Sequence, residues 1–370
     1  MKILIISFGN SDNDGRLLEL IKAFNHIGTV SLVSTSTGTK NLTISKHKII
    51  KVNHNNYLTY SNYFKFILMS LKEAIMKKNY DILVVDNYLA SIPGMIIAKL
   101  IKPSFLIQDV RELYFVSERK SVKEKIFVFF EKLLLKKADI VIGANKERVH
   151  IMKKEHKLKE LPIVFENIRL LPKVKKDSEF LEKYQYLFSK GNFNLICSGG
   201  FYLSRLTDEL VKSMKFIDKN INLIIIGGGT EVDRIALENI IKKENIKNVE
   251  LLGKVSLEEL NYVIKNCHVG VVNYHQKDLN NIYCASGKIY EFLGDGLPVV
   301  TTNNISLKEI CERYGVGVSD DDFQKSITKV YNNYSAYKAN VQIFKEHLSS
   351  DNNNLKLANE IKDILKKSYE

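Results

Sequence analysis

The sequence has few cysteines, and no arrangement of them that could hold a metal or build a disulfide framework. The four are widely spaced along 370 residues, and none belongs to a C-x-x-C pair. This usage is typical of a reducing compartment, so we expect a cytoplasmic protein. The cysteines are Cys197, Cys267, Cys284 and Cys311.

Long apolar runs are also absent. No window approaches the roughly 18 uninterrupted apolar residues that a membrane-spanning helix requires. The first residues, MKILIIS, contain one lysine and a short apolar run, which predicts a first strand and not a signal peptide. The eight histidines are scattered, and no Ser-His-Asp or Cys-His set can be argued from their spacing.

Acidic residues are scarce in the first half of the chain. Residues 1–170 hold 28 Lys and Arg against 16 Asp and Glu, whereas the remainder holds 27 against 26. This asymmetry indicates that the first half meets something anionic. Nucleic acid, anionic lipid and a phosphorylated acceptor all fit that description.

Short apolar runs alternate with helical patterns along the chain. Residues 81–86 and 105–109 are continuous apolar runs that end in Asp, as in parallel strands buried on both faces. A charged segment interrupts this rhythm, which restarts at Phe193 and predicts a second doubly wound sheet. We therefore expect a first domain at 1–170, a linker at 171–192, a second domain at 193–350 and a C-terminal helix at 351–370 that crosses back to the first.

Two loops of the first half follow predicted strands. Gly9 and Gly15 lie in a loop that could cradle a phosphate, although the spacing is not G-x-G-x-x-G and a plain turn is the alternative. Residues 109–112, Asp-Val-Arg-Glu, stand at the carboxyl end of a strand, where ligands of such sheets collect. A capped turn with a local salt bridge would explain them equally well.

Two helices of the first half combine apolar and basic residues. Residues 117–137 show the strongest amphipathic pattern, with lysines around a broad apolar stripe. Core packing explains the stripe, while the basic rim would also suit anionic lipid headgroups. Residues 57–78 predict an aromatic, basic helix that lies against its own sheet or faces a membrane.

The most informative stretch is residues 279–304. Lys288 and Glu291 are three apart on a predicted helix and therefore share a face. The diphosphate of a sugar nucleotide would suit Lys288 and the helix N-terminus, and its ribose hydroxyls would suit an ionised Glu291. A simple surface ion pair is the alternative interpretation.

Four blocks of the second half resemble, in the same order, those of the retaining family 4 glycosyltransferases of bacterial capsule, O-antigen and exopolysaccharide synthesis. The most specific is GKIYEFLGDGLPVV, where the family reads close to P-x-K-x-x-E-Y-x-A-x-G-x-P-V-V. QDVRELY and ADIVIGANKERV in the first half are similar to the family more loosely. The resemblance implies an α/β fold of GT-B architecture, with two Rossmann-like domains that face each other across a cleft. The blocks are residues 198–200 with Arg205, 223–229, 253–260 and 288–300.

The resemblance also implies roles for single residues. Glu291 would bind the ribose, and Lys288 and Arg205 would neutralise the departing diphosphate. Asp109 and Arg111 would face the acceptor. The other implied nucleotide-sugar positions are Gly9, Gly15, Gly199, Gly200, Val255, Ser286 and Gly287. No D-x-D-like motif stands in a plausible loop, so we expect metal-independent transfer without a cofactor, with a UDP- or GDP-linked sugar as substrate.

Three positions depart from the family pattern. Tyr283 stands where an earlier glutamate is common, and Ser286 replaces the usual proline two residues before Lys288. The Lys-Gly that usually follows the first glycine loop is absent. These departures concern the identity of the sugar and how its hydroxyls are held.

We therefore expect an enzyme that transfers a sugar to a lipid-linked saccharide in cell-surface polysaccharide synthesis. It would associate peripherally with an anionic membrane surface, at the inner face of the plasma membrane, without a nucleic acid partner. One alternative is a sugar-nucleotide epimerase of the same fold, which would need paired histidines and carboxylates. The other is a non-catalytic module for an anionic polymer, whose affinity would collapse with salt.

Overall fold

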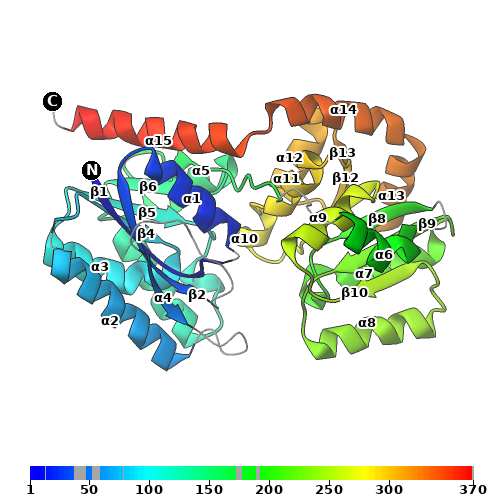
Figure 1. Ribbon diagram of the computed structural model, residues 1–370, viewed down its shortest axis with the longest axis horizontal. Helices are drawn as coiled ribbons and strands as arrows, with labels where there is room; N and C mark the ends of the chain where they lie inside the picture. Colours follow the sequence, from blue (N-terminus) through cyan, green and yellow to red (C-terminus); the bar gives the residue numbers. More distant parts are fainter. Residues whose placement is uncertain are drawn as a thin grey trace. The chain divides into compact units, whose positions relative to one another are not determined.

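The computed structural model describes residues 1–12, 14–36, 47–51, 59–77, 79–171, 177–188 and 192–368. The chain forms two compact units. The first comprises Met1–Asn167 and Ser350–Glu370, and the second comprises Ile168–Ser349. Each is built around its own parallel sheet (Figure 1).

The sheet of the first unit has seven parallel strands in the order β3-β2-β1-β4-β5-β6-β7. Strand order reverses at β1 and β4, so the carboxyl ends of these strands form a topological switch point. The register places Ser7 beside Asp86, and Asp86 beside Asp109. The strands are β1 (Lys2–Asn10), β2 (Thr29–Ser36), β3 (His47–Lys51), β4 (Ile82–Asp86), β5 (Phe105–Val110), β6 (Ile140–Gly143) and β7 (Ile163–Val164).

Both faces of this sheet are covered by helices, which explains why its strands are apolar throughout. Helices α1 (Gly15–Asn25) and α15 (Ser350–Lys367) pack on one face. Helices α2 (Tyr60–Lys77), α3 (Ser91–Ile101) and α4 (Val122–Leu135) pack on the other (Figure 1). Helix α5 (Lys146–His156) connects β6 to β7.

The last helix belongs to the first unit, as the sequence predicted. Leu357, Ile361 and Leu365 of α15 are buried in the core with α1. Asn354 Nδ2 donates a hydrogen bond to Glu19 Oε2 of α1 at 2.6 Å. Apolar packing and a buried hydrogen bond therefore hold the end of the chain on the first sheet.

The sheet of the second unit has six parallel strands in the order β10-β9-β8-β11-β12-β13. They are β8 (Phe193–Cys197), β9 (Ile221–Ile226), β10 (Val249–Leu252), β11 (Val269–Val272), β12 (Val299–Thr301) and β13 (Gly317–Ser319).

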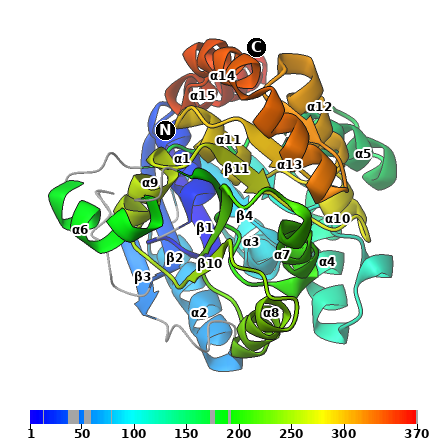
Figure 2. The same cartoon turned by 90° about the vertical axis from the view of Figure 1, so that its right-hand side faces the viewer.

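Helices again cover both faces of this second sheet. On one side pack α6 (Asp177–Phe188), α9 (Leu257–Lys265), α11 (Gly287–Gly294), α12 (Ile305–Tyr314) and α14 (Tyr334–His347). On the other pack α7 (Thr207–Ser213), α8 (Glu231–Lys243) and α13 (Phe323–Asn332). Helix α14 runs beside α12 and α13 (Figure 2). The short α10 (Leu279–Ile282) precedes α11.

The structure differs from the expected linker at residues 171–192. The first unit ends at Asn167, and residues 177–188 form α6 of the second unit. Phe180, Tyr184 and Leu187 of this helix are buried in the core. Their i, i+4, i+7 spacing is the apolar stripe of a packed helix, which surrounding charged residues concealed. Residues 172–176 and 189–191 lie outside the described part of the chain.

Candidate functional site

Helix α11 carries the two residues that the sequence singled out. Ile289, Phe292 and Leu293 anchor it in the core. A Cβ on Gly270 of β11 would lie 2.3 Å from two carbons of the Phe292 side chain, so only glycine at that position lets the helix approach the sheet. This packing directs Lys288 and Glu291 along one side of α11, near the carboxyl ends of β8 and β11.

A glycine turn after β8 approaches Lys288 closely. A Cβ on Gly199 would lie 3.1 Å from Lys288 Nζ. Gly200 has φ +77°, and a Cβ there would lie 1.9 Å from the Gly228 carbonyl oxygen. Gly200 therefore answers both a steric and a conformational requirement, whereas a side chain on Gly199 would meet only the tip of Lys288. The structure brings Gly199 and Lys288 together, while their contact with a nucleotide sugar stays a prediction.

Arg205 reaches the same place from the short helix after this turn. Its guanidinium lies over the ring of Tyr274 at 5.5 Å, and Lys288 Nζ lies over that ring at 5.6 Å. Arg205 Nη1 donates a long hydrogen bond of 3.5 Å to the Gly199 carbonyl. Asn273 Nδ2 donates to the Arg205 carbonyl at 2.7 Å and fixes the backbone there. Two cations therefore converge on one aromatic ring and one glycine turn.

The surroundings of Lys288 disfavour its charge. Burial lowers the pKa of Lys288 to about 8, and the neighbouring Arg205 adds to the effect. Burial raises the pKa of Glu291, which is 5% exposed, against the opposing charges of Arg169 and Lys288. A lysine whose pKa is lowered, with a second cation beside it, is expected at a site that binds an anion.

Sequence reasoning missed two members of this group. Arg169 forms an ion pair with Glu291, with 2.5 Å between Nε and Oε1. Tyr274 supplies the ring beneath both cations, and its hydroxyl donates to Ser286 Oγ at 3.3 Å. Arg169 follows β7, far from α11 in the chain, and no local pattern links it to Glu291. Tyr274 follows β11 and could be suspected only from its place at a strand's carboxyl end.

The remaining predicted positions of the second unit lie in two places, the N-terminus of α11 and the loop before α9. Ser286 and Gly287 are buried at the N-terminus of α11, and their contact with a phosphate stays a prediction. Val255 lies in the loop between β10 and α9 and packs against the apolar core. Its predicted place beside a base stays a prediction.

The predicted acceptor residues of the first unit are held in an ion network. Asp109 is fully buried and accepts two hydrogen bonds from Arg16, at 2.6 and 3.0 Å. Arg111 pairs with Asp86 and Asp14. The expectation that Asp109 faces an acceptor is therefore corrected, because its carboxylate is enclosed and already paired. The sequence analysis considered residues 109–112 as a local loop, and it missed their partners Asp86 on β4 and Arg16 on α1.

The Asp86 carboxylate of this network has a perturbed pKa. Burial raises its pKa to about 6, while Arg111 opposes that rise. Ser7 Oγ donates to Asp86 Oδ2 at 2.5 Å. Gly9 lies in β1 above this group, where a Cβ would meet Asp14 Oδ2 at 3.0 Å, and Gly15 begins α1. The two predicted glycines thus border a network whose charges compensate one another.

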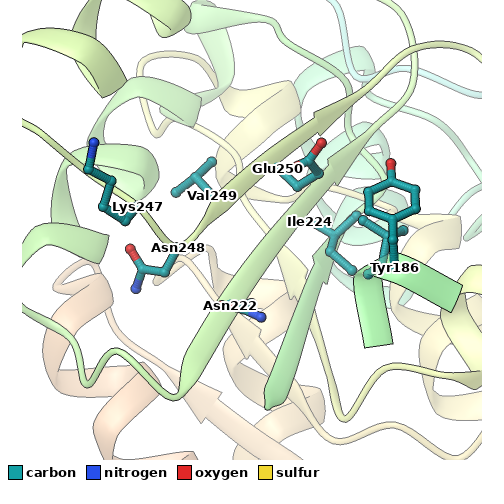
Figure 3. Close-up of a pocket in the computed structure, with 8 residues that line it drawn as sticks. Tyr186, Asn222, Ile224, Lys247, Asn248, Val249 and Glu250 are labelled. Carbon is teal, nitrogen blue, oxygen red and sulfur yellow. The ribbon is translucent and has the colours of Figure 1, made fainter. Parts of the chain in front are cut away.

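A shallow pocket lies at the opposite, amino ends of strands in the second unit (Figure 3). Tyr186 stands on its α6 side, and Asn222 and Glu250 belong to β9 and β10 (Figure 3). The side-chain amide of Asn248 already has hydrogen-bond partners, because its Nδ2 donates to two backbone carbonyls. The pocket shares no residue with the cations around Lys288.

Among the described residues, no group of three or more His, Cys, Asp or Glu side chains is placed to hold a metal ion.

The fold described above is that of the GT-B class, with two Rossmann-like units, and solved structures confirm it. Anabaena HepE, solved in complex with UDP and glucose, aligns with 98% of this chain and 100% of its own at 14% identity and a TM-score of 0.73. Sucrose-phosphate synthase of Thermosynechococcus elongatus aligns with 100% of this chain and 99% of its own, at 15% identity and a TM-score of 0.68. WaaG, a glycosyltransferase involved in lipopolysaccharide biosynthesis, aligns over 97% and 99% of the two chains, at 12% identity and a TM-score of 0.66.

Residues 192–333 match the family model described as glycosyl transferases group 1. An uncharacterised glycosyltransferase of Methanocaldococcus jannaschii is 33% identical over 89 residues, which is 24% of this chain and 24% of that protein. The chain thus matches about a quarter of that relative's length. The resemblance of the second unit to glycosyltransferases is confirmed by the family model, whereas family 4, the retaining outcome and the capsule-type role stay predictions.

The buried pair of Arg16 and Asp109 yields a test of whether Asp109 is structural. We expect Arg16→Met or Asp109→Asn to lower the free energy of unfolding of the first unit by about 3–5 kcal/mol, because each leaves a charge buried without its partner. The double variant should recover part of that loss. Urea unfolding measures the effect. A stable Asp109→Asn protein with lost activity would contradict the structural role.

Proposed function

We propose that this protein is a glycosyltransferase whose second unit binds a UDP- or GDP-linked sugar. The observation that carries the proposal is the convergence of Lys288 and Arg205 on the Gly199 turn, with Glu291 one turn along the same helix as Lys288. The group 1 family match over residues 192–333 and the UDP complex of the structurally similar HepE support it.

The site would act through charge and orientation. The diphosphate would lie against Lys288, Arg205 and the N-terminus of α11, where backbone N–H groups and the helix dipole favour an anion. As the bond from the anomeric carbon to the diphosphate breaks, negative charge grows on the leaving oxygen. Cations fixed in place stabilise that charge without reorganising. No metal ion is needed in this scheme.

Glu291 would accept hydrogen bonds from the ribose hydroxyls and so fix the nucleoside. The acceptor hydroxyl would then attack the anomeric carbon from the face that the diphosphate leaves, which retains the configuration. A new bond joins the acceptor oxygen to that carbon as the bond to the diphosphate breaks, and the proton of the acceptor hydroxyl passes to the departing phosphate oxygen. Tyr283 in place of the common earlier glutamate would alter the contacts of the sugar ring.

Removing the charge of Glu291 tests the proposed nucleotide site. We expect Glu291→Gln to weaken UDP or GDP binding by about 1–3 kcal/mol, because a charge-assisted hydrogen bond to ribose is lost. Isothermal titration calorimetry measures the affinity. Glu309→Gln removes an exposed carboxylate of α12 and serves as the matched control. Unchanged affinity for both nucleotides in the Glu291 variant would contradict the assignment.

For the acceptor, we propose a lipid-linked saccharide reached at an anionic membrane, on the cytoplasmic side. Within the described parts of the chain, no helix combines the length and apolarity needed to cross a bilayer. Helices α2 and α4 instead present exposed apolar side chains, here called the α2–α4 face. These are Tyr60, Phe64 and Leu68 of α2, at 81%, 60% and 50% exposure, with Val122, Ile126 and Phe129 of α4, at 73%, 47% and 49%.

The two stripes of this face are joined and bordered by lysines. Lys123 Nζ of α4 lies over the Tyr60 ring of α2 at 4.7 Å. Lys65, Lys125 and Lys132 are exposed on the same helices. An apolar stripe with a basic border is the pattern by which peripheral helices bind anionic lipid.

Charge reversal tests this docking. We expect the triple variant Lys123→Glu, Lys125→Glu and Lys132→Glu to lose binding to vesicles of anionic phosphatidylglycerol, because attraction to the headgroups becomes repulsion. Phe64→Ser should weaken binding without changing charge. Vesicle co-sedimentation measures both, and reversal of Lys219, Lys242 and Lys243 in the second unit is the charge-matched control. Equal retention of all variants at low salt would overturn the docking.

A further inference from the structure

Arg169 forms an ion pair with Glu291, the residue whose carboxylate would bind ribose in the proposed function. Its Nε lies 2.5 Å from Glu291 Oε1, and its side chain is 34% exposed while that of Glu291 is 5% exposed. The pair therefore joins a partly open guanidinium to an enclosed carboxylate. Arg169 stands at the second residue of the second unit, directly after the chain leaves the first.

Arg169 also lies across the first residue of α11. A Cβ on Gly287 would lie 2.7 Å from Arg169 Nε and 3.2 Å from Arg169 Cζ. The absence of a side chain at Gly287 is thus what allows the guanidinium to pass the helix N-terminus and reach Glu291 on the next turn. This packing fixes the direction from which Arg169 approaches.

The charged groups around Glu291 leave Arg169 as the main source of compensation. Lys288 lies on the same helix, and Asp295, the residue that caps its C-terminus, acts against ionisation of Glu291. Strands β11 and β12, which pack on α11, contribute no titratable side chain. On α14, Lys338 donates to the Gly296 carbonyl at 2.6 Å and Lys345 lies near Asp295, both at the far end of α11.

We propose that Arg169 is a positioning residue that holds Oε1 of Glu291 so that Oε2 faces the ribose hydroxyls of the nucleotide. This inference rests on the proposed function. Arg169 does not touch the reacting atoms. It orients the carboxylate and keeps it ionised, because a buried carboxylate without its strongest cationic neighbour binds a proton more readily.

The pH dependence of nucleotide affinity separates this role from simple packing. Removing a cation beside Glu291 raises the pKa of its carboxyl further, so on acidification affinity is lost at a higher pH. We expect Arg169→Met to shift the acid limb of UDP affinity upward by about one pH unit, which makes binding about tenfold weaker at a pH on that limb. Near pH 8, where the Glu291 carboxyl stays ionised, the loss of affinity should be smaller, because only the orientation of the carboxylate is lost.

Calorimetric titration of the full-length protein with UDP provides the measurement. Arg169→Lys should return the acid limb to near its wild-type pH because it restores the charge. Glu291→Gln should lack the part of the limb that comes from the Glu291 carboxyl and keep only the part set by the UDP phosphate, whose last pKa is near 6. Arg169→Gln serves as a second uncharged variant if the methionine variant does not fold. An acid limb unchanged in both uncharged variants would overturn the positioning role alone. Failure of the wild type to bind either UDP or GDP would overturn the proposed function and this inference together.

Discussion

A partly buried lysine ammonium, with a second cation beside it, is the feature on which the proposed site depends. Burial of a charge costs free energy unless an opposite charge compensates it. Around Lys288 the nearest carboxylate, Glu291, is already paired with Arg169. Among the residues that the structure describes, the local excess of positive charge is therefore not compensated, and an anionic ligand would relieve it.

The two units use charge in opposite ways. In the first, Arg16 pairs with Asp109, and Arg111 pairs with Asp86 and with Asp14, which caps the N-terminus of α1. Those groups stabilise one another and connect β4, β5 and the start of α1, and the hydrogen bond from Ser7 to Asp86 connects β1 to them. In the second, a glycine turn and the start of α11 bring cations together without an equal number of acids. The contrast supports the proposal that the second unit binds the nucleotide sugar, while the first offers the exposed α2–α4 face.

Local patterns predicted much of this structure, and long-range pairing limited the rest. Continuous apolar runs such as residues 81–86 identified buried parallel strands, and the three-residue spacing of Lys288 and Glu291 placed them on one helix face. The Arg16–Asp109 pair joins residues far apart in sequence, so residues 109–112 were interpreted as a local loop. Helix α6 was missed because charged neighbours concealed Phe180, Tyr184 and Leu187. Arg169 could not be linked to Glu291 without knowing that Gly287 leaves room for its guanidinium.

Proton uptake on nucleotide binding tests the central claim most directly. At about pH 8.5 a lysine whose pKa lies near 8 is largely neutral, and a bound diphosphate would raise that pKa and draw in a proton. The UDP phosphates, whose last pKa is near 6, are already ionised at that pH and contribute none. Calorimetric titration in buffers of different ionisation enthalpy should show uptake of about half a proton or more in the wild type, and none in Lys288→Met. UDP binding with no uptake by the wild type would contradict the account.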